Sequence, residues 1–203
     1  MNQIWLIRHG ATAGNLQRRY IGRTDEPLCS LGEQQALQLR GIISAECLFV
    51  SPMLRARQTA ALVFPTMAYS VVQDLRETDF GIFEGKTAAE MENDPQYRLW
   101  VEGGCRGDIP EGEGAADCKR RCLNAFCRAL ASVPAEQSAA FVFHGGGIMA
   151  VLEALGRPKR DYYGWHIENG KYITGWYDGK NILTDEIGGQ STNGQSPTRS
   201  ESV

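Results

Sequence analysis

Short apolar runs alternate along this chain with longer amphipathic stretches. The longest helical pattern covers residues 114–132 and places Cys118, Cys122 and Phe126 on one face. Strands that alternate with helices predict an α/β fold, a three-layer sandwich with helices on both faces of a mostly parallel central sheet. The apolar runs of strand length are residues 3–8, 47–51, 69–73 and 139–143.

Capping residues mark where several helices are expected to begin. Residues 30–33 and 87–90 each have the sequence of a capping box. A helix over 52–63 is expected, because Pro52 suits its first position and Ser51 can cap it.

The C-terminal part of the pattern predicts a hairpin. Residues 171–177 and 181–187 both alternate, and the Asp178-Gly179 dipeptide between them is typical of a hairpin turn. This hairpin is expected to add an antiparallel edge strand to the sheet. A helix over 147–155 precedes it.

Two segments depart from the alternation of strands and helices. Residues 79–113 are glycine-rich and irregular, and predict a cap-like insertion over a crevice. Residues 188–203 have no apolar pattern and predict a disordered tail. We therefore expect one domain over residues 1–187.

Composition limits the partners and the compartment of the protein. The net charge of −3 over 203 residues argues against nucleic-acid and membrane partners. No secretory signal or membrane-spanning apolar segment is seen, and the six cysteines lack paired metal-ligand spacing. We expect a cytoplasmic protein with reduced thiols, no metal and no cofactor; the oligomeric state stays open.

Two of the three histidines stand where a buried strand ends and a glycine turn begins. His9, preceded by Arg8, follows the first strand, and His144 follows the fourth. Arg55 lies in the first turn after the second strand, and Glu77 follows the third. If these strands are parallel, all five side chains reach the same edge of the sheet, where ligands bind in α/β folds.

Such a set suits phosphoryl transfer through a covalent intermediate. Arginine forks bind phosphate oxygens, and the free N–H groups of a helix start at residues 145–147 favour an anion. A neutral imidazole is a competent nucleophile near neutral pH, and a carboxyl group can protonate the leaving oxygen. This chemistry needs no metal.

Five segments that contain these residues form an ordered pattern. They are L-I-R-H-G-x-T-x-x-N (6–15), Y-x-G-x-x-D-x-P-L (20–28), S-P-x-x-R-A-x-x-T (51–59), L-R-E-x-D-F-G-x-F-E-G (75–85) and F-H-G-G (143–146). The pattern resembles that of the histidine phosphatase superfamily, which includes the cofactor-dependent phosphoglycerate mutases. The resemblance covers roughly residues 3–187 and implies a phosphoglycerate mutase-like fold.

The resemblance also implies a role for each matching residue. His9 would be the nucleophile that becomes phosphohistidine, and Glu77 the proton donor. Arg8, Arg55 and His144 would take part in catalysis as well as binding. The phosphate-binding residues would be Arg8, Asn15, Arg55, His144 and Gly145.

Other charged residues near these segments have structural interpretations. We expect Asp79 and Glu84 to hold the loop around Glu77, and Glu113 and Arg121 to form a structural or supporting ion pair. His166 is expected to pack beside its neighbouring tryptophan. Three arginines of the first loop are either solvated or attract an anionic substrate: Arg18, Arg19 and Arg23.

The resulting hypothesis is a phosphatase that hydrolyses a small phosphorylated metabolite through phosphohistidine. Residues 77–81, residues 110–114 and the aromatic-rich region 162–177 resemble α-ribazole phosphatases, which makes α-ribazole phosphate one candidate substrate. A phosphoglycerate mutase is the alternative enzyme, although mutases of this type usually have longer insertions. A phospho-ligand sensor without turnover is the non-enzymatic alternative.

Overall fold

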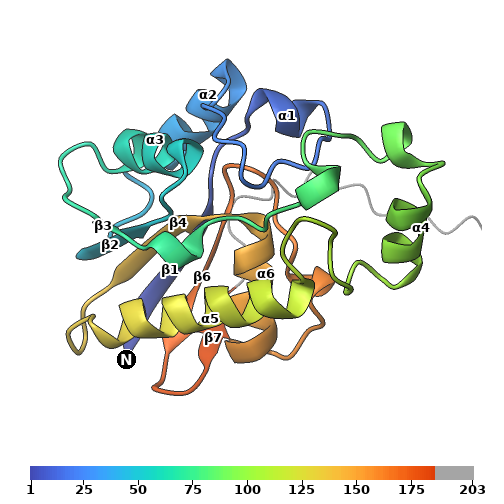
Figure 1. The fold of residues 1–203 in the computed structure, drawn as a ribbon. Coiled ribbons are helices and arrows are strands. Elements are labelled where there is room, and N and C mark those ends of the chain that lie inside the picture. Colours follow the sequence, from blue (N-terminus) through green and yellow to red (C-terminus); the bar gives the residue numbers. More distant parts are fainter. Residues whose placement is uncertain (186–203) are drawn as a thin grey trace, which may run out of the picture.

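A mixed sheet forms the centre of the computed structural model, which describes residues 1–185 (Figure 1). The predicted tail over 188–203 and the last two residues of the predicted hairpin lie outside the described residues. The strands are β1 (Asn2–Arg8), β2 (Cys47–Val50), β3 (Ser70–Val71), β4 (Ala139–Phe143), β5 (Gly156–Arg157), β6 (Tyr172–Tyr177) and β7 (Ile182–Thr184).

The strands pair in the order β3-β2-β4-β1-β6-β7-β5. β1, β2, β3 and β4 are all parallel to one another, and β6 is antiparallel to both β1 and β7. The mostly parallel sheet is therefore confirmed, and the terminal hairpin supplies the antiparallel strand. β6 does not form the outer edge, because β7 and the two-residue β5 pair beyond it.

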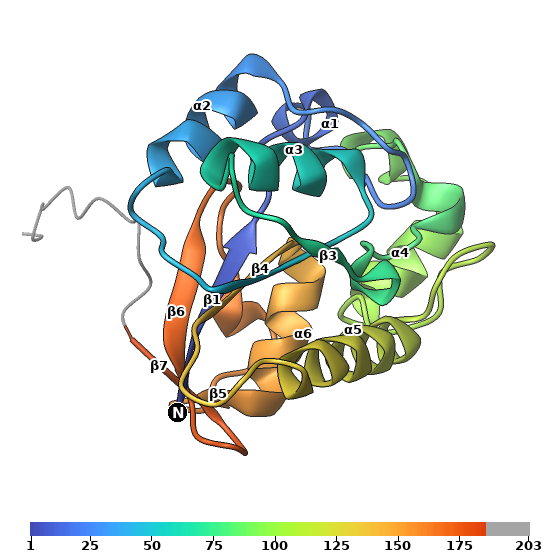
Figure 2. The ribbon, with the colours of Figure 1, turned by 90° about the vertical axis from the view of Figure 1, so that its left-hand side faces the viewer.

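Helices cover both faces of the sheet, as predicted (Figure 2). α2 (Ser30–Leu39) and α3 (Leu54–Val63) pack on one face, where Ile7, Val50 and Val142 point. α5 (Ala115–Ala131) and α6 (Gly145–Leu155) pack on the other face, against Leu6 and Phe141. Successive residues of a strand point to opposite faces, so one apolar strand contributes to both cores.

The remaining helices are short. They are α1 (Ala13–Leu16), α4 (Pro95–Glu102) and four 3-10 turns at Gln73–Leu75, Gly81–Phe83, Ala89–Met91 and Tyr163–Trp165. None of the helices within residues 1–185 is both long and apolar enough to cross a lipid bilayer.

The segment 79–113 is more regular than its sequence indicated. Asp94 caps α4 by accepting the backbone N–H of Gln96 at 2.9 Å, and Pro95 occupies the first helical position. Proline is favoured there because its missing N–H would have no partner in any case. A separate apolar cluster holds this segment together through Phe83, Met91, Tyr97, Trp100 and Ile109.

Some predicted element boundaries are wrong. α3 begins at Leu54 after Met53, so Pro52 is not its first residue and Ser51 is not its cap. α2 is preceded by Cys29 and has no side-chain cap, which removes the predicted box at residues 30–33. Capping patterns are local, and the Ser51 hydroxyl instead lies 2.7 Å from the Nε2 of His144, a residue far along the chain.

Other boundaries hold or shift slightly. The box at residues 87–90 is confirmed, since Thr87 and Glu90 exchange side-chain hydrogen bonds of 2.8 and 3.2 Å with each other's backbone N–H groups. α6 begins at Gly145, two residues earlier than expected, and the third strand is only two residues long.

Candidate active site

The ends of β1 and β4 bring His9 and His144 together. The strands are adjacent and parallel, and Arg8 pairs in register with Phe143. The two imidazole rings lie edge to face with their centroids 5.1 Å apart, and both are buried. The predicted meeting of these histidines at one sheet edge is therefore observed.

His9 is held in a defined tautomer by its own turn. Its Nδ1 lies 2.7 Å from the carbonyl oxygen of Gly10, which can only accept a hydrogen bond, so Nδ1 carries the proton. Nε2 is then left with its lone pair. Burial lowers the pKa of His9 well below its ordinary value, and the nearby Arg55 and Arg8 cations lower it further. A neutral ring with a free Nε2 is suited to nucleophilic attack.

The turn after His9 is tied to α3. The Gly10 N–H donates to Thr59 Oγ1 at 3.0 Å, and the same hydroxyl donates to the carbonyl of Arg55 at 2.7 Å. The Gly10 backbone also approaches Gly32 so closely that a Cβ would lie 2.2 Å from the Gly32 carbonyl oxygen. Thr59 therefore fixes the turn after His9 relative to the helix that carries Arg55.

Two arginines supply positive charge, Arg55, which is buried, and Arg8, which is half-buried. Arg8 Nη1 donates to the carbonyl of Ile167 at 2.7 Å, and Arg55 donates to the carbonyls of Thr24 and Gly22 at 2.9 and 3.0 Å. Burial lowers the pKa of both groups, yet a guanidinium remains protonated in proteins. In the described part of the chain neither forms an ion pair with a carboxylate. Cations that are partly or fully buried and lack a carboxylate partner favour an anionic ligand.

His144 contacts a residue that the sequence analysis assigned to another role. Its Nε2 lies 2.7 Å from Ser51 Oγ, the hydroxyl expected to cap α3. Burial lowers the pKa of His144, and the charges of Arg55, His9 and Arg8 add to this effect. Six buried side-chain polar atoms have no partner within residues 1–185, and two of them belong to this site, namely His144 Nδ1 and Arg8 Nε. Oxygens of a bound anion could satisfy both, if His144 Nδ1 carries a proton.

Glu77 lies beside the start of α6. Its Oε1 accepts hydrogen bonds from the Thr78 N–H at 2.9 Å and from Thr78 Oγ1 at 3.3 Å. A Cβ added to Gly146 would lie only 2.9 Å from that oxygen. The glycine at this position therefore leaves room for the carboxylate.

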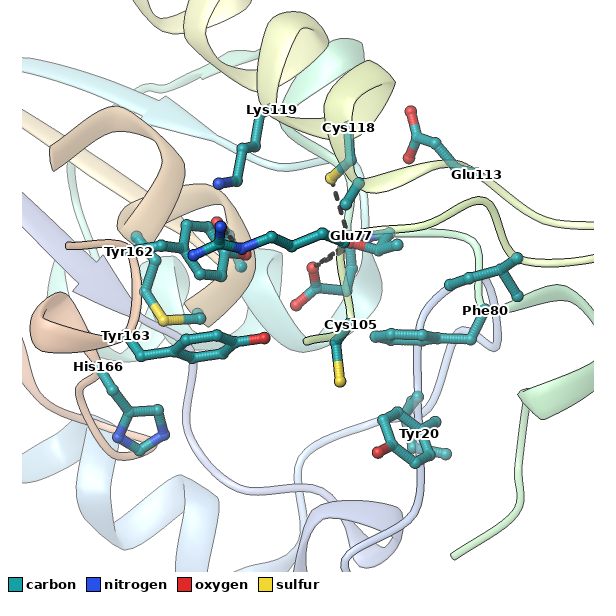
Figure 3. A pocket seen from close by; sticks show the side chains of 18 of the residues that line it. Tyr20, Glu77, Phe80, Cys105, Glu113, Cys118, Lys119, Tyr162, Tyr163 and His166 are labelled. Carbon is teal, nitrogen blue, oxygen red and sulfur yellow. Dashed lines mark hydrogen bonds between the residues drawn. The ribbon is translucent and has the colours of Figure 1, made fainter. Parts of the chain in front are cut away.

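A cavity of about 350 Å³ opens from this site. Arg8, His9, Asn15, Glu77 and Gly145 line it, whereas Arg55 and His144 do not and are buried next to it. In Figure 3 the carboxylate of Glu77 lies between tyrosines 162 and 163 on one side and Phe80 on the other. The remaining walls combine polar and charged residues with aromatic and aliphatic ones, and the latter include Tyr20, Ile21, Phe80, Trp100, Ile109, Met149, Tyr162 and Tyr163.

Asn15 and Gly145, which the resemblance assigned to phosphate binding, line the cavity. Asn15 Oδ1 already accepts from the Thr12 N–H and from Asn169 Nδ2, at 3.2 and 3.1 Å, so its own Nδ2 is the group that can donate to a ligand. Gly145 is the first residue of α6, where backbone N–H groups have no helical acceptor. Asn169, which also donates to the His9 carbonyl at 3.1 Å, was not identified from the sequence.

The structural interpretations of nearby charges are mostly confirmed. Glu84 accepts the N–H groups of Gly22 and Thr24 at 2.8 and 2.9 Å, and Asp79 accepts that of Gly81 at 2.9 Å. The Glu113–Arg121 ion pair is formed.

The interpretation of His166 is wrong. This side chain is exposed and lines the cavity, and the guanidinium of Arg160 covers the ring of Trp165 at 4.7 Å. Of the loop arginines, Arg19 lines the cavity and pairs with Glu90 at 2.8 Å, and Arg23 lies 3.6 Å from Asp79. Across residues 1–185, no three His, Cys, Asp or Glu side chains gather as a metal site would require.

Comparison with known families identifies the family to which this chain belongs. The family model described as the histidine phosphatase superfamily, branch 1, matches residues 4–185. The chain belongs to the histidine phosphatase superfamily. The match covers every segment on which the resemblance rested, and the mixed sheet agrees with the phosphoglycerate mutase-like fold expected of the superfamily.

Relatives within the superfamily bear different functional names. The chain is 32% identical over 166 residues to the "Probable phosphoglycerate mutase GpmB" of Klebsiella pneumoniae (strain 342), covering 78% of this chain and 77% of that protein. It is also 32% identical to a crystal structure of phosphoglycerate mutase from Thermus thermophilus, with a TM-score of 0.71 over 89% of this chain and 96% of that one.

A third similarity concerns the fold. The structure of "a putative alpha-ribazole-5'-P phosphatase" from Escherichia coli superposes with a TM-score of 0.81 at 24% identity, covering 92% of this chain and 95% of that one. The fold of this superfamily member is thus shared with proteins named as mutases and as a phosphatase.

Proposed function

We propose that this protein is a phosphatase that hydrolyses a small phosphorylated metabolite through a phosphohistidine at His9. One observation carries the proposal: the Nδ1 of His9 is held by the Gly10 carbonyl, so its free Nε2 lies in a buried site with the cations Arg8 and Arg55. The ring is a nucleophile rather than a general acid, because its pKa is lowered by burial and by those cations.

The reaction proceeds in two steps. His9 Nε2 attacks the phosphorus and the bond to the leaving oxygen breaks, while Glu77 donates its proton to that oxygen. Water then attacks the phosphohistidine, Glu77 accepts a proton from it, and phosphate leaves as the neutral ring re-forms. Cations and neutral hydrogen-bond donors around the phosphoryl oxygens stabilise the charge in both transition states. These groups are Arg8, Arg55, Asn15, His144 and the Gly145 N–H.

The walls of the cavity support a substrate with an aromatic or apolar leaving group. The aromatic side chains among them include Tyr20, Phe80, Trp100 and Tyr162. Aromatic walls stack well on a flat heterocycle. α-Ribazole phosphate has such a group, and a structure of the same fold carries an alpha-ribazole-5'-P phosphatase name. We therefore propose it as the first specific substrate to test.

Phosphoglycerate mutase activity is the second candidate. It is favoured by the names of the Klebsiella and Thermus relatives, both 32% identical to this chain. A mutase must also bind the carboxylate of its substrate. Lys119 and Arg19 line the cavity, but each is paired with a carboxylate. Besides Arg8, Arg106 is the lining arginine or lysine that has no ion-pair partner among the described residues, so it is the cation that could bind this carboxylate.

We further propose that residues 79–113 act as a cap that shapes this cavity within a single domain over 1–187. Phe80, Trp100 and Ile109 of this segment line its wall. We also propose the reducing cytoplasm as the location, an inference that rests on the cysteine pattern of the sequence.

Parallel assays with three compounds test the proposed function. The protein is incubated with p-nitrophenyl phosphate, α-ribazole phosphate and 3-phosphoglycerate, and both free phosphate and isomerised product are measured. Phosphate release without isomerisation is expected. Isomerisation of 3-phosphoglycerate that is faster than phosphate release would establish the mutase instead. Tight binding of the esters with no turnover would establish a sensor.

A further inference from the structure

The side chain of Arg121, on α5, reaches the backbone of the segment that carries Glu77. Its Nη1 donates to the carbonyl oxygens of Asp74 and Arg76 at 2.7 and 2.9 Å, and its Nη2 approaches the carbonyl of Glu77 at 3.4 Å. One guanidinium thus contacts three backbone carbonyls within four consecutive residues. No helix or strand holds this stretch beyond the 3-10 turn that ends at Leu75.

Glu113 fixes the orientation of that guanidinium. Arg121 Nε donates to one carboxylate oxygen at 2.6 Å and Nη2 to the other, which is a bidentate pair. The two side chains are only 10% and 14% exposed. Glu113 is itself anchored, because its N–H donates to the carbonyl of Asp79 at 2.8 Å. The ion pair therefore contacts the backbone both before Glu77, at Asp74 and Arg76, and after it, at Asp79.

The same helix contacts the residue that holds the carboxylate. Thr78, which donates to Glu77 Oε1 through both its N–H and its hydroxyl, has its Oγ1 3.1 Å from the Sγ of Cys118. Cys118 lies one helical turn before Arg121 on α5. Cys118 and Glu77 both line the cavity shown in Figure 3. The loop backbone and the carboxylate are thus both fixed relative to α5.

We propose that Arg121 and Glu113 are positioning residues that place the Glu77 carboxyl for proton transfer to the leaving group. This inference rests on the proposed function, in which Glu77 is the proton donor. A general acid must lie within hydrogen-bond reach of the atom it protonates, and small displacements cost much of its effect. Neither residue needs to touch the substrate to have this influence.

The choice of leaving group separates positioning from general stability. Phenyl phosphate releases a much poorer leaving group than p-nitrophenyl phosphate, so its cleavage depends more on a proton donor. In Arg121→Ala, kcat/KM for phenyl phosphate should fall about 10-fold more than for p-nitrophenyl phosphate. A merely structural role would reduce both values by the same factor.

A second readout does not depend on activity. The Thr78 amide reports the Glu77 carboxylate directly, since the two are hydrogen bonded at 2.9 Å. In the ¹⁵N-labelled full chain, the chemical shift of this amide should change in Arg121→Ala. If that variant does not fold, Glu113→Gln, which keeps one acceptor oxygen, replaces it. This variant should show a smaller change in the leaving-group ratio and a smaller change in the Thr78 chemical shift.

Arg128→Ala is the matched control. Arg128 is on the same helix and pairs with the side chain of Asp74 at 3.0 Å, but it is exposed and contacts no carbonyl of the loop. It should leave both the leaving-group ratio and the Thr78 amide unchanged. An unchanged ratio together with an unchanged Thr78 amide in the Arg121 and Glu113 variants would overturn the proposal. If the wild-type chain cleaves neither ester, the phosphatase function fails, and the Thr78 amide alone decides the positioning.

Discussion

The rings of His9 and His144 lie edge to face, 5.1 Å apart between centroids, at the ends of adjacent parallel strands. Burial is the main reason that the pKa of each is lowered, and Arg55 acts on both. The two rings are therefore neutral near pH 7, and the positive charge of the site resides on Arg8 and Arg55. This arrangement allows one ring to attack a phosphoryl group that the arginines hold.

The lowered pKa values predict how stability depends on pH. In the unfolded chain both histidines titrate near their ordinary value of about 6.5. The folded protein resists protonation at His9 and His144, so the unfolded chain binds more protons as the pH falls below that value. The contribution of these two histidines to the free energy of unfolding is thus fully present above about pH 6.5. At lower pH this contribution decreases, by up to about 1.4 kcal/mol per pH unit for each ring.

Urea denaturation at about pH 7.5 and about pH 5.5 checks this slope. His144→Gln should show a smaller loss between the two conditions than the wild-type chain, whereas replacement of the exposed His166 should matter much less. The same loss in the wild-type chain and in His144→Gln would argue against the buried, neutral state of His144.

Ser51→Ala should weaken phosphate binding through His144. The buried hydroxyl lies 2.7 Å from Nε2, and its removal leaves that nitrogen without a partner, at a cost of about 1–3 kcal/mol in stability. We expect kcat/KM for p-nitrophenyl phosphate to fall about 10-fold, with weaker inhibition by inorganic phosphate. Ser138→Ala, which removes an exposed hydroxyl bonded to Glu46, is the control. Unaltered phosphate inhibition in Ser51→Ala would show that Ser51 does not orient His144.

Gly146→Ala should impair turnover with little effect on folding. The new Cβ would lie 2.9 Å from Glu77 Oε1, and the carboxylate can move away because it is the end of a flexible side chain. We therefore expect a lower kcat/KM, most of all for phenyl phosphate, and a thermal unfolding midpoint close to that of the wild type. Gly103→Ala provides the comparison, because its Cβ would meet only contacts of 3.4 Å. Full activity in Gly146→Ala would contradict the placement of Glu77 as proton donor.

The main elements of the site could be predicted because they follow from local patterns. Apolar runs that end in Arg8-His9 and at His144 predict parallel strands, and parallel strands deliver their last residues to one edge. The third strand is shorter than predicted, yet Glu77 still reaches the site, because β3 pairs with β2 in the expected direction. Errors in length therefore did not change the arrangement.

The contacts that orient the site could not be predicted in the same way. Ser51 has the sequence context of a helix cap, and only the approach of His144 from a distant strand gives its hydroxyl a different partner. The pairing of Glu113 with Arg121 was expected. The hydrogen bonds from Arg121 to the backbone before Glu77 could not be expected, because they depend on where α5 packs. Asn169 carried no signal at all, since a single asparagine in a loop has many ordinary uses.

Direct detection of a phosphoryl group on His9 is the decisive measurement. The protein is mixed rapidly with p-nitrophenyl phosphate, quenched at alkaline pH, where phosphohistidine survives, and mapped by mass spectrometry. We predict one phosphoryl group on His9 that is lost in mild acid. His9→Ala should lose the group and about 10³-fold or more of kcat/KM, while His166→Ala keeps both. Undiminished turnover in His9→Ala, or a phosphoryl group on another residue, would contradict the account.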